Sequence, residues 1–145
     1  SETLTKILKI TLSAQVGDEG KDDVELPSAG DVMEYLEIAC RGRLETASDK
    51  LSEALNVDAA TIHRVLLDRS GEALVVMLKA AGFPRSNVSG LLPAMKRGDV
   101  PLLDPERDVS ELQSMFDTLS LNKARILLTY WNWAVRKSGP YAPVH

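Results

Sequence analysis

Residues 70–82, SGEALVVMLKAAG, carry apolar side chains almost all the way round a helix. Ser70 stands where a helix needs an N-cap, and Gly82 stands where the helix has to end. A helix that is apolar on every side cannot face water, so it belongs at the centre of a core. The sequence therefore predicts that this segment is the central helix of the fold.

The flanking sequence has a capping residue before each apolar pattern and a terminator after it. Ser28 with Asp31 resembles a capping box, and Asn56 can adopt the left-handed backbone conformation that ends an α-helix. Pro93 removes a backbone donor, so we expect its helix to kink or split near Leu92. Further caps are expected from Asp58, Asp108 and Ser120, and the expected helices begin near residues 31, 46, 58, 70, 85, 108 and 121.

The predicted fold class is all-α, a compact multi-helix domain of about six to seven short helices with a helix-turn-helix-like pair. Residues 1–30 are expected to form an N-terminal helix and an acidic connection, and residues 31–145 the compact domain. The segment 3–16 suits either a helix or a strand, and a helix is favoured. Among the apolar positions we expect Leu74, Leu78, Leu128 and Trp131 to be buried.

The composition is that of an ordinary globular domain, with 145 residues, 44% hydrophobic and 26% charged. The formal net charge of −4 gives no general reason to expect nucleic acid. Its distribution is uneven, since residues 120–145 contain four cations and no acid. We expect no membrane span, because no apolar run approaches about 20 residues, and a cytoplasmic location.

Residues that would support catalysis are scarce, so we expect no enzyme, no cofactor and no metal site. Cys40 lies on an apolar helix face and is expected to be a buried small hydrophobe. The segment 17–23 lacks the spacing of a phosphate-binding loop. Asp68 and Ser70 are expected to satisfy free backbone donors at the start of the central helix, and Glu72 to complement its dipole. The alternative is an acidic ligand site at Asp68 and Glu72.

The helix pair within 46–69 has the apolar spacing of a helix-turn-helix. A DNA-binding regulator is therefore an alternative function, with Thr61, His63 and Arg64 as the candidate contacts. Four acidic residues of the same pair oppose a phosphate backbone, so we expect packing rather than nucleic-acid binding: Asp49, Glu53, Asp58 and Asp68.

The last helix, 121–137, has more large apolar residues than one buried stripe can hold. Leu121, Ala124, Leu128, Trp131 and Val135 form the stripe that we expect to be buried. Four residues outside it are candidates for partner binding: Tyr130, Trp133, Arg125 and Arg136. The partner would be another protein or a second copy. The alternative is that the first helix covers these flanks through Leu4, Ile7 and Leu8.

Three stretches resemble one bacterial family, in the family's order: LNVDAATIHRVLLDRSGEAL (55–74), MLKAAGFPRSNVSGLL (77–92) and MFDTLSLNKARILLTYWNWAVR (115–136). Over about Leu44 to Arg136 the chain resembles the uncharacterised, largely alphaproteobacterial family of domain of unknown function 2336. The resemblance implies an all-helical domain and no particular reaction or cofactor. The function expected first is a non-enzymatic helical protein-interaction or regulatory module; an unrecognised enzyme or small-ligand receptor is third.

Overall fold

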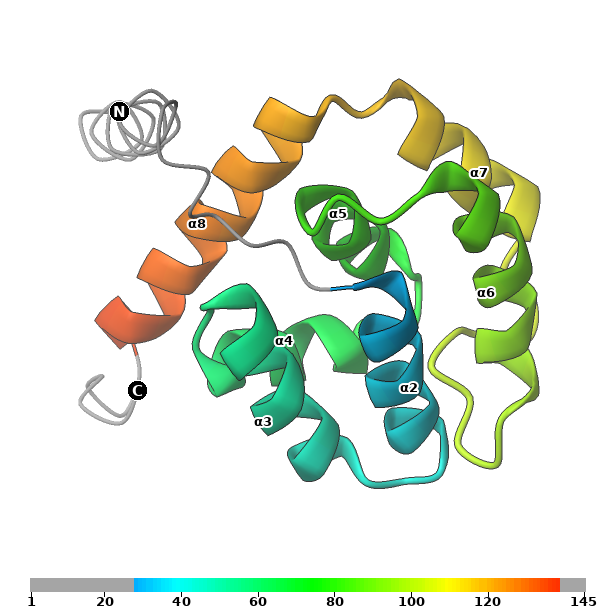
Figure 1. The fold of residues 1–145 in the computed structure, drawn as a ribbon, viewed down its shortest axis with the longest axis horizontal. Helices are drawn as coiled ribbons and strands as arrows, with labels where there is room; N and C mark the ends of the chain where they lie inside the picture. The colour runs from blue at the N-terminus through cyan, green and yellow to red at the C-terminus, as the bar shows by residue number, and fades with distance from the viewer. Residues whose placement is uncertain (1–27, 139–145) are drawn as a thin grey trace.

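The computed structural model describes residues 28–138, and every regular element in that range is an α-helix (Figure 1). Helices make up 75% of the described residues, which confirms the all-α prediction. The segments 1–27 and 139–145 lie outside them, so the expected N-terminal helix and the division at residue 30 stay predictions. The helices are α2 (Ala29–Cys40), α3 (Leu44–Leu55), α4 (Ala59–Leu67), α5 (Glu72–Ala80), α6 (Arg85–Arg97), α7 (Val109–Thr118) and α8 (Leu121–Ser138).

Helix α5 is the central helix that its composition predicts. It packs against α4, α7 and α8, and in Figure 1 it lies between the α8 side and the α6–α7 side of the molecule. Every residue from Leu74 to Leu78 is buried. From Leu74 to Leu78 no side of α5 faces water, and its exposed residue, Glu72, lies in the first turn. None of the described helices has both the length and the apolar character needed to cross a bilayer.

Two predictions for the core at α8 are wrong. Leu78, Leu74 and Leu128 are buried as expected, but Trp131 is only partly buried. The Trp131 side chain lines a surface hollow between α8 and α4, so part of it remains open to water. Leu121 is 39% exposed, because it is the first residue of α8 and the buried stripe starts one turn later.

Helix α6 runs from Arg85 to Arg97 without a break, so Pro93 does not split it. Leu91 and Leu92 on one side of the proline and Met95 on the other are all buried. The helix contacts α2 and α7. Packing on both sides of Pro93 therefore holds the two halves in one helix despite the missing backbone donor.

Most helices begin or end with the capping residues that the sequence predicts. The hydroxyl of Ser28 accepts a hydrogen bond from the Asp31 backbone, and Ser120 does the same for Lys123. Asp108 accepts from the backbone of Ser110, and Asn56 is left-handed with φ 56°. The α3 helix begins at Leu44, two residues earlier than predicted. These ends depend on bonds between residues close in sequence, which is why the sequence predicts them.

The start of α5 differs in detail from the prediction, because the N-cap position belongs to Gly71 and not to Ser70. Gly71 has φ 82°, and a Cβ atom there would lie 2.6 Å from Leu103 and 2.8 Å from Leu112. Only glycine combines this backbone with so close an approach. The carboxylate of Asp68 accepts hydrogen bonds from Ser70 and from the Ala73 backbone.

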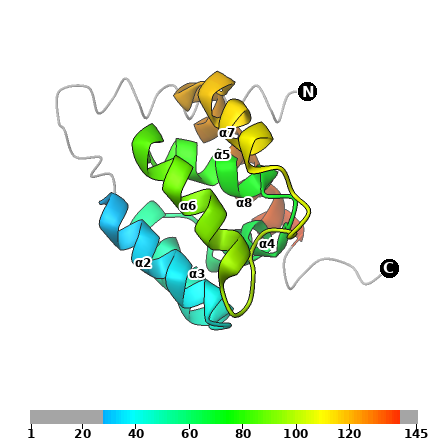
Figure 2. The same ribbon diagram turned by 90° about the vertical axis from the view of Figure 1, so that its right-hand side faces the viewer.

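The connection between α6 and α7 closes one end of the core, where α2 and α3 lie side by side (Figure 2). The Val100 backbone donates to the Cys40 carbonyl at 2.7 Å, and Leu102 and Leu103 are buried. Cys40 is buried as predicted, and burial raises the pKa of its thiol. The thiol is therefore a packed side chain of the core.

Candidate functional site

The first turn of α4 is covered by α8. The side-chain oxygen of Asn132 accepts hydrogen bonds from the Asp58 backbone at 2.9 Å and from the Thr61 hydroxyl at 2.8 Å. Asn132, which belongs to α8, thus satisfies a free backbone donor at the start of α4. Nothing in the local sequence near Asp58 signals this, so sequence reasoning missed Asn132.

Asp58 occupies the N-cap position of α4, but its side chain makes no capping hydrogen bond, which corrects the prediction. Its carboxylate instead accepts two hydrogen bonds from Arg136, at 2.7 and 3.1 Å. These bonds and the charge of Arg136 hold the pKa of Asp58 below its usual range. Arg136, predicted to bind a partner, is therefore used within the chain to join α8 to α4.

The three residues predicted to contact nucleic acid differ in their exposure to solvent. Thr61 is 1% exposed with its hydroxyl bonded to Asn132, so it cannot contact a duplex in this conformation. His63 and Arg64 are exposed. A recognition helix contacts base edges with its N-terminal residues. Because α8 covers that end of α4, the geometry weighs against the DNA-binding alternative.

A hollow of about 200 Å³ lies between α4, α5 and α8. Its lining is mostly apolar, with Ala73 and Trp131 on two sides and Arg64 as the one charged residue. Within residues 28–138, no group of three or more His, Cys, Asp or Glu side chains is placed to hold a metal ion. The hollow therefore offers apolar contact and one cation.

The side of α8 that faces away from the core carries an aromatic pair. Tyr130 and Trp133 are each 38% exposed, and their rings stack with centroids 6.1 Å apart and planes at 26°. The Lys137 ammonium lies 5.7 Å from the centre of the Trp133 ring. Helical spacing brings Ile126 and Lys123 to the same side. We call these five residues, Lys123, Ile126, Tyr130, Trp133 and Lys137, the outer face of α8.

Arg125 is not part of this face. Its guanidinium donates to the carbonyl of Ala80 at 3.3 Å, at the C-terminal end of α5, where a cation complements the helix dipole. Of the four predicted partner-binding residues, the structure brings Tyr130 and Trp133 together on the surface. Arg125 and Arg136 each have a partner within the domain, and the Arg136 side chain is 67% exposed.

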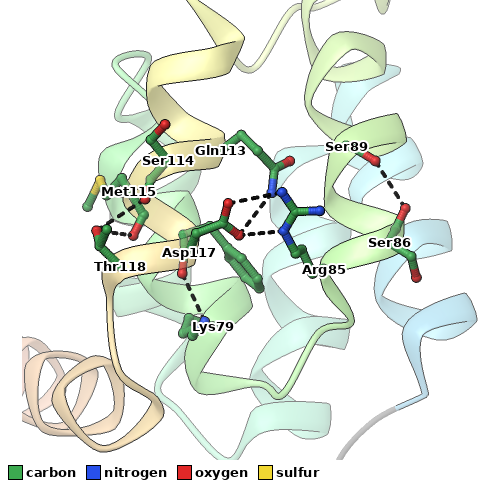
Figure 3. Close-up of polar contacts among 10 residues, drawn as sticks. Lys79, Arg85, Ser86, Ser89, Gln113, Ser114, Met115, Asp117 and Thr118 are labelled. Atoms are coloured by element: carbon green, nitrogen blue, oxygen red, sulfur yellow. Dashed lines mark hydrogen bonds and ion pairs between the residues drawn. The ribbon is translucent and has the colours of Figure 1, made fainter.

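A second polar cluster, which the sequence did not indicate, joins α5, α6 and α7 (Figure 3). Arg85 donates twice to the Asp117 carboxylate, at 2.7 and 3.1 Å, and Gln113 adds a weaker bond. The Lys79 ammonium donates to the Phe116 carbonyl at 2.8 Å and lies 4.2 Å from the centre of its ring. These bonds join the three helices, although the buried side-chain oxygen of Gln113 has no hydrogen-bond partner among the described residues.

Asp68 and Glu72, the alternative acidic ligand site, also have partners within the chain. The Asp68 carboxylate is bonded to the α5 start as described above, and Glu72 lies 3.7 Å from Arg107. This arrangement supports the packing interpretation of the turn.

Comparison with known proteins gives a family but no individual relative. No curated protein and no solved structure matches the chain. The sequence model of one family, described as an uncharacterised protein conserved in bacteria, matches residues 35–129. The match begins within α2 and ends one residue before Tyr130. Because it covers well over half of the 145 residues, the chain belongs to this bacterial family, defined by domain of unknown function 2336 (DUF2336).

Proposed function

We propose that the chain is a cytoplasmic protein-interaction module with no chemistry of its own, and that it binds a partner protein on the outer face of α8. The observation that carries this proposal is the stacked pair Tyr130 and Trp133, which is exposed on the surface of the part of the chain that the structure describes. Exposed tryptophan and tyrosine side chains are the residues that most often anchor protein–protein contacts.

The charges around the pair indicate the chemistry of the partner. Lys123 and Lys137 are exposed, and neither forms a salt bridge with another residue of the range 28–138. The partner segment should therefore offer apolar side chains to Tyr130 and Trp133, with carboxylates at its edge.

The other functions have less support. A catalytic or small-ligand site would need several polar groups converging in a pocket. The hollow beside Arg64 supplies one cation and the already bonded Thr61 hydroxyl. A DNA-binding function would need the first turn of α4, which Asn132 covers.

The proposal is tested by capture of partners from a lysate of the source bacterium with matched bait proteins. Trp133→Ala should lose the partners that the unaltered chain retains, and Lys137→Glu should weaken their capture. Leu67→Ala is the control, because Leu67 is a 54% exposed hydrophobic on α4, away from this face. A partner set that is the same for the unaltered chain, Trp133→Ala and Leu67→Ala would contradict the proposal.

A further inference from the structure

The hollow between α4, α5 and α8 has the size of one large apolar side chain. Its volume is about 200 Å³, and an apolar cavity of about 150 Å³ is enough to hold benzene. Val65 and Trp131 line it, and Trp131 is only partly buried, so a group placed here removes apolar surface from water. The Thr61 hydroxyl in the lining already donates to Asn132, so it requires no hydrogen bond from an occupant. The hollow therefore suits an apolar group with about the bulk of a leucine or phenylalanine side chain.

The charge at the hollow is positive. Arg64 lines it, is exposed, and forms no salt bridge with another residue of the range 28–138. The three carboxylates at the ends of α4 and the start of α5 have other partners: Asp58 accepts from Arg136, Asp68 from the start of α5, and Glu72 lies 3.7 Å from Arg107. Arg64 is thus left without an ionic partner among the described residues. An occupant that places a carboxylate beside it gains an ion pair.

The hollow adjoins the outer face of α8. Ala134 lines the hollow and follows Tyr130 of the outer face by one helical turn. One partner segment lying along α8 therefore contacts Tyr130 and Trp133 and reaches the hollow with a single side chain. Protein interfaces commonly concentrate their binding energy in this way, with an anchor residue in a pocket and weaker contacts around it.

We infer that this hollow is the anchor pocket of the docking surface on α8. It takes one large apolar side chain of a partner protein, and an aspartate or glutamate of the same segment pairs with Arg64. Because Arg64 lines the hollow itself, that acid lies within about four residues of the anchor, the range in which side chains of a helix are neighbours. The inference deepens the proposed function and rests on it, since it takes the outer face as the adjoining binding surface.

Peptide selection tests the chemistry of the occupant. The immobilised full chain selects binders from a phage-displayed library of random peptides of about 12 residues, roughly three turns of a helix. The selected peptides should share a large apolar residue with an aspartate or glutamate within about four positions of it.

Two substitutions at the hollow and two matched controls measure how these peptides bind. Ala73→Leu fills the hollow and should raise the dissociation constant at least about tenfold, the effect of blocking an anchor. Arg64→Gln should raise it about two- to fivefold, the value of a partly exposed ion pair. Because Arg64 is exposed, its substitution tests the pocket even where Ala73→Leu perturbs the fold. Ala54→Leu on α3 and Arg97→Gln at the end of α6 lie outside the hollow and should leave the dissociation constant unchanged.

Tryptophan fluorescence locates the bound peptide. The chain has two tryptophans, so Trp133→Phe leaves Trp131, in the lining of the hollow, as the single tryptophan. A selected peptide without tryptophan should shift the Trp131 emission to shorter wavelength, because filling the hollow removes water from the ring. Adding Ala73→Leu should abolish this peptide-dependent shift.

Selected peptides without an acidic residue, or with equal affinity for Ala73→Leu, Arg64→Gln and the two controls, would overturn the inference. So would a selection that enriches no peptide able to shift the Trp131 emission. Light scattering that shows self-association of the unaltered chain, lost with Ala73→Leu, would overturn it too, by identifying a second copy as the occupant.

The two proposals fail separately. If peptide binding and partner capture depend on Ala73 and Arg64 but not on Trp133, the proposed role of the outer face fails and the pocket stands. If capture depends on Trp133 but is the same for Ala73→Leu and Ala54→Leu, the proposed function stands and the inference fails.

Discussion

At the scale of single residues, one carboxamide connects two segments that are far apart in the chain. Asn132 accepts from the Asp58 backbone and the Thr61 hydroxyl, 74 and 71 residues away. Because Thr61 is buried, its hydroxyl has no water to replace Asn132 as a partner. The α8–α4 contact therefore depends on this side chain.

Asn132→Ala should lower the free energy of unfolding by about 1–3 kcal/mol, the cost of leaving a buried polar group without a partner. Urea denaturation measures the loss. The matched control is Asn122→Ala on the same helix, where Asn122 is exposed and the change should cost less than about 0.5 kcal/mol. Equal effects of the two substitutions would show that the cap does not stabilise the domain.

Replacing two glycines by alanine should change the stability of the fold in opposite directions. At Gly71 the positive φ and the contact with Leu103 leave no room for a Cβ atom, so Gly71→Ala should destabilise the fold by about 1–3 kcal/mol. Gly90 lies inside α6 with no atom within 4 Å of an added Cβ. Gly90→Ala should stabilise by about 0.5–1 kcal/mol. Thermal unfolding that shifts in the same direction for both would contradict this account.

At the scale of elements, α5 is the helix around which α4, α7 and α8 pack. It is buried from Leu74 to Leu78 and contacts α4, α7 and α8. The neighbouring helices therefore need only one apolar side each, which is the pattern that their sequences show.

Leu78→Ala should lower the free energy of unfolding by about 2–5 kcal/mol, because the core cannot collapse around the removed atoms. Leu67→Ala, at a 54% exposed position, should cost less than about 0.5 kcal/mol. Urea denaturation of both variants gives the comparison. A loss at Leu78 as small as that at Leu67 would show that α5 is not the centre of the core.

The Asp58–Arg136 pair makes the α4–α8 contact dependent on pH. Arg136 lowers the pKa of Asp58, so the pair stabilises the fold above the unfolded pKa of about 3.9 and its contribution is lost as the pH falls through the folded pKa. The stability difference between the unaltered chain and Arg136→Gln should therefore be present at neutral pH and vanish in acid. Arg97→Gln, at an exposed position at the end of α6, is the control. A difference that persists unchanged into acid would rule out this ionic origin.

At the scale of the whole molecule, the packing of α8 over α4 limits what the helix pair α3–α4 can bind. We expect no specific duplex binding at an ionic strength of about 0.15 M, since phosphate contacts weaken steeply with salt and the α4 start is covered. Selection from random duplexes measures this. A selected site that is bound tightly, lost with Arg64→Ala and kept with Arg97→Ala would show that the helix pair binds DNA.

The sequence by itself determined the fold class, the central helix and most helix ends. Ser28, Asn56, Asp108 and Ser120 act on backbone groups within about four residues, so their effects are readable locally. Apolar periodicity likewise depends only on spacing along one helix. The sequence also predicted that Tyr130 and Trp133 would stand outside the buried stripe, which the structure confirms.

The tertiary structure alone decided the roles of the polar side chains on α8. Asn132 caps a helix more than 70 residues away, Arg136 pairs with Asp58 across 78 residues, and Arg125 binds the end of α5. It also left Trp131 partly open at the hollow beside α4. The physical reason is that hydrogen bonds and charges act over a few ångströms, so their partners are fixed only when packing of the apolar faces brings distant helices together.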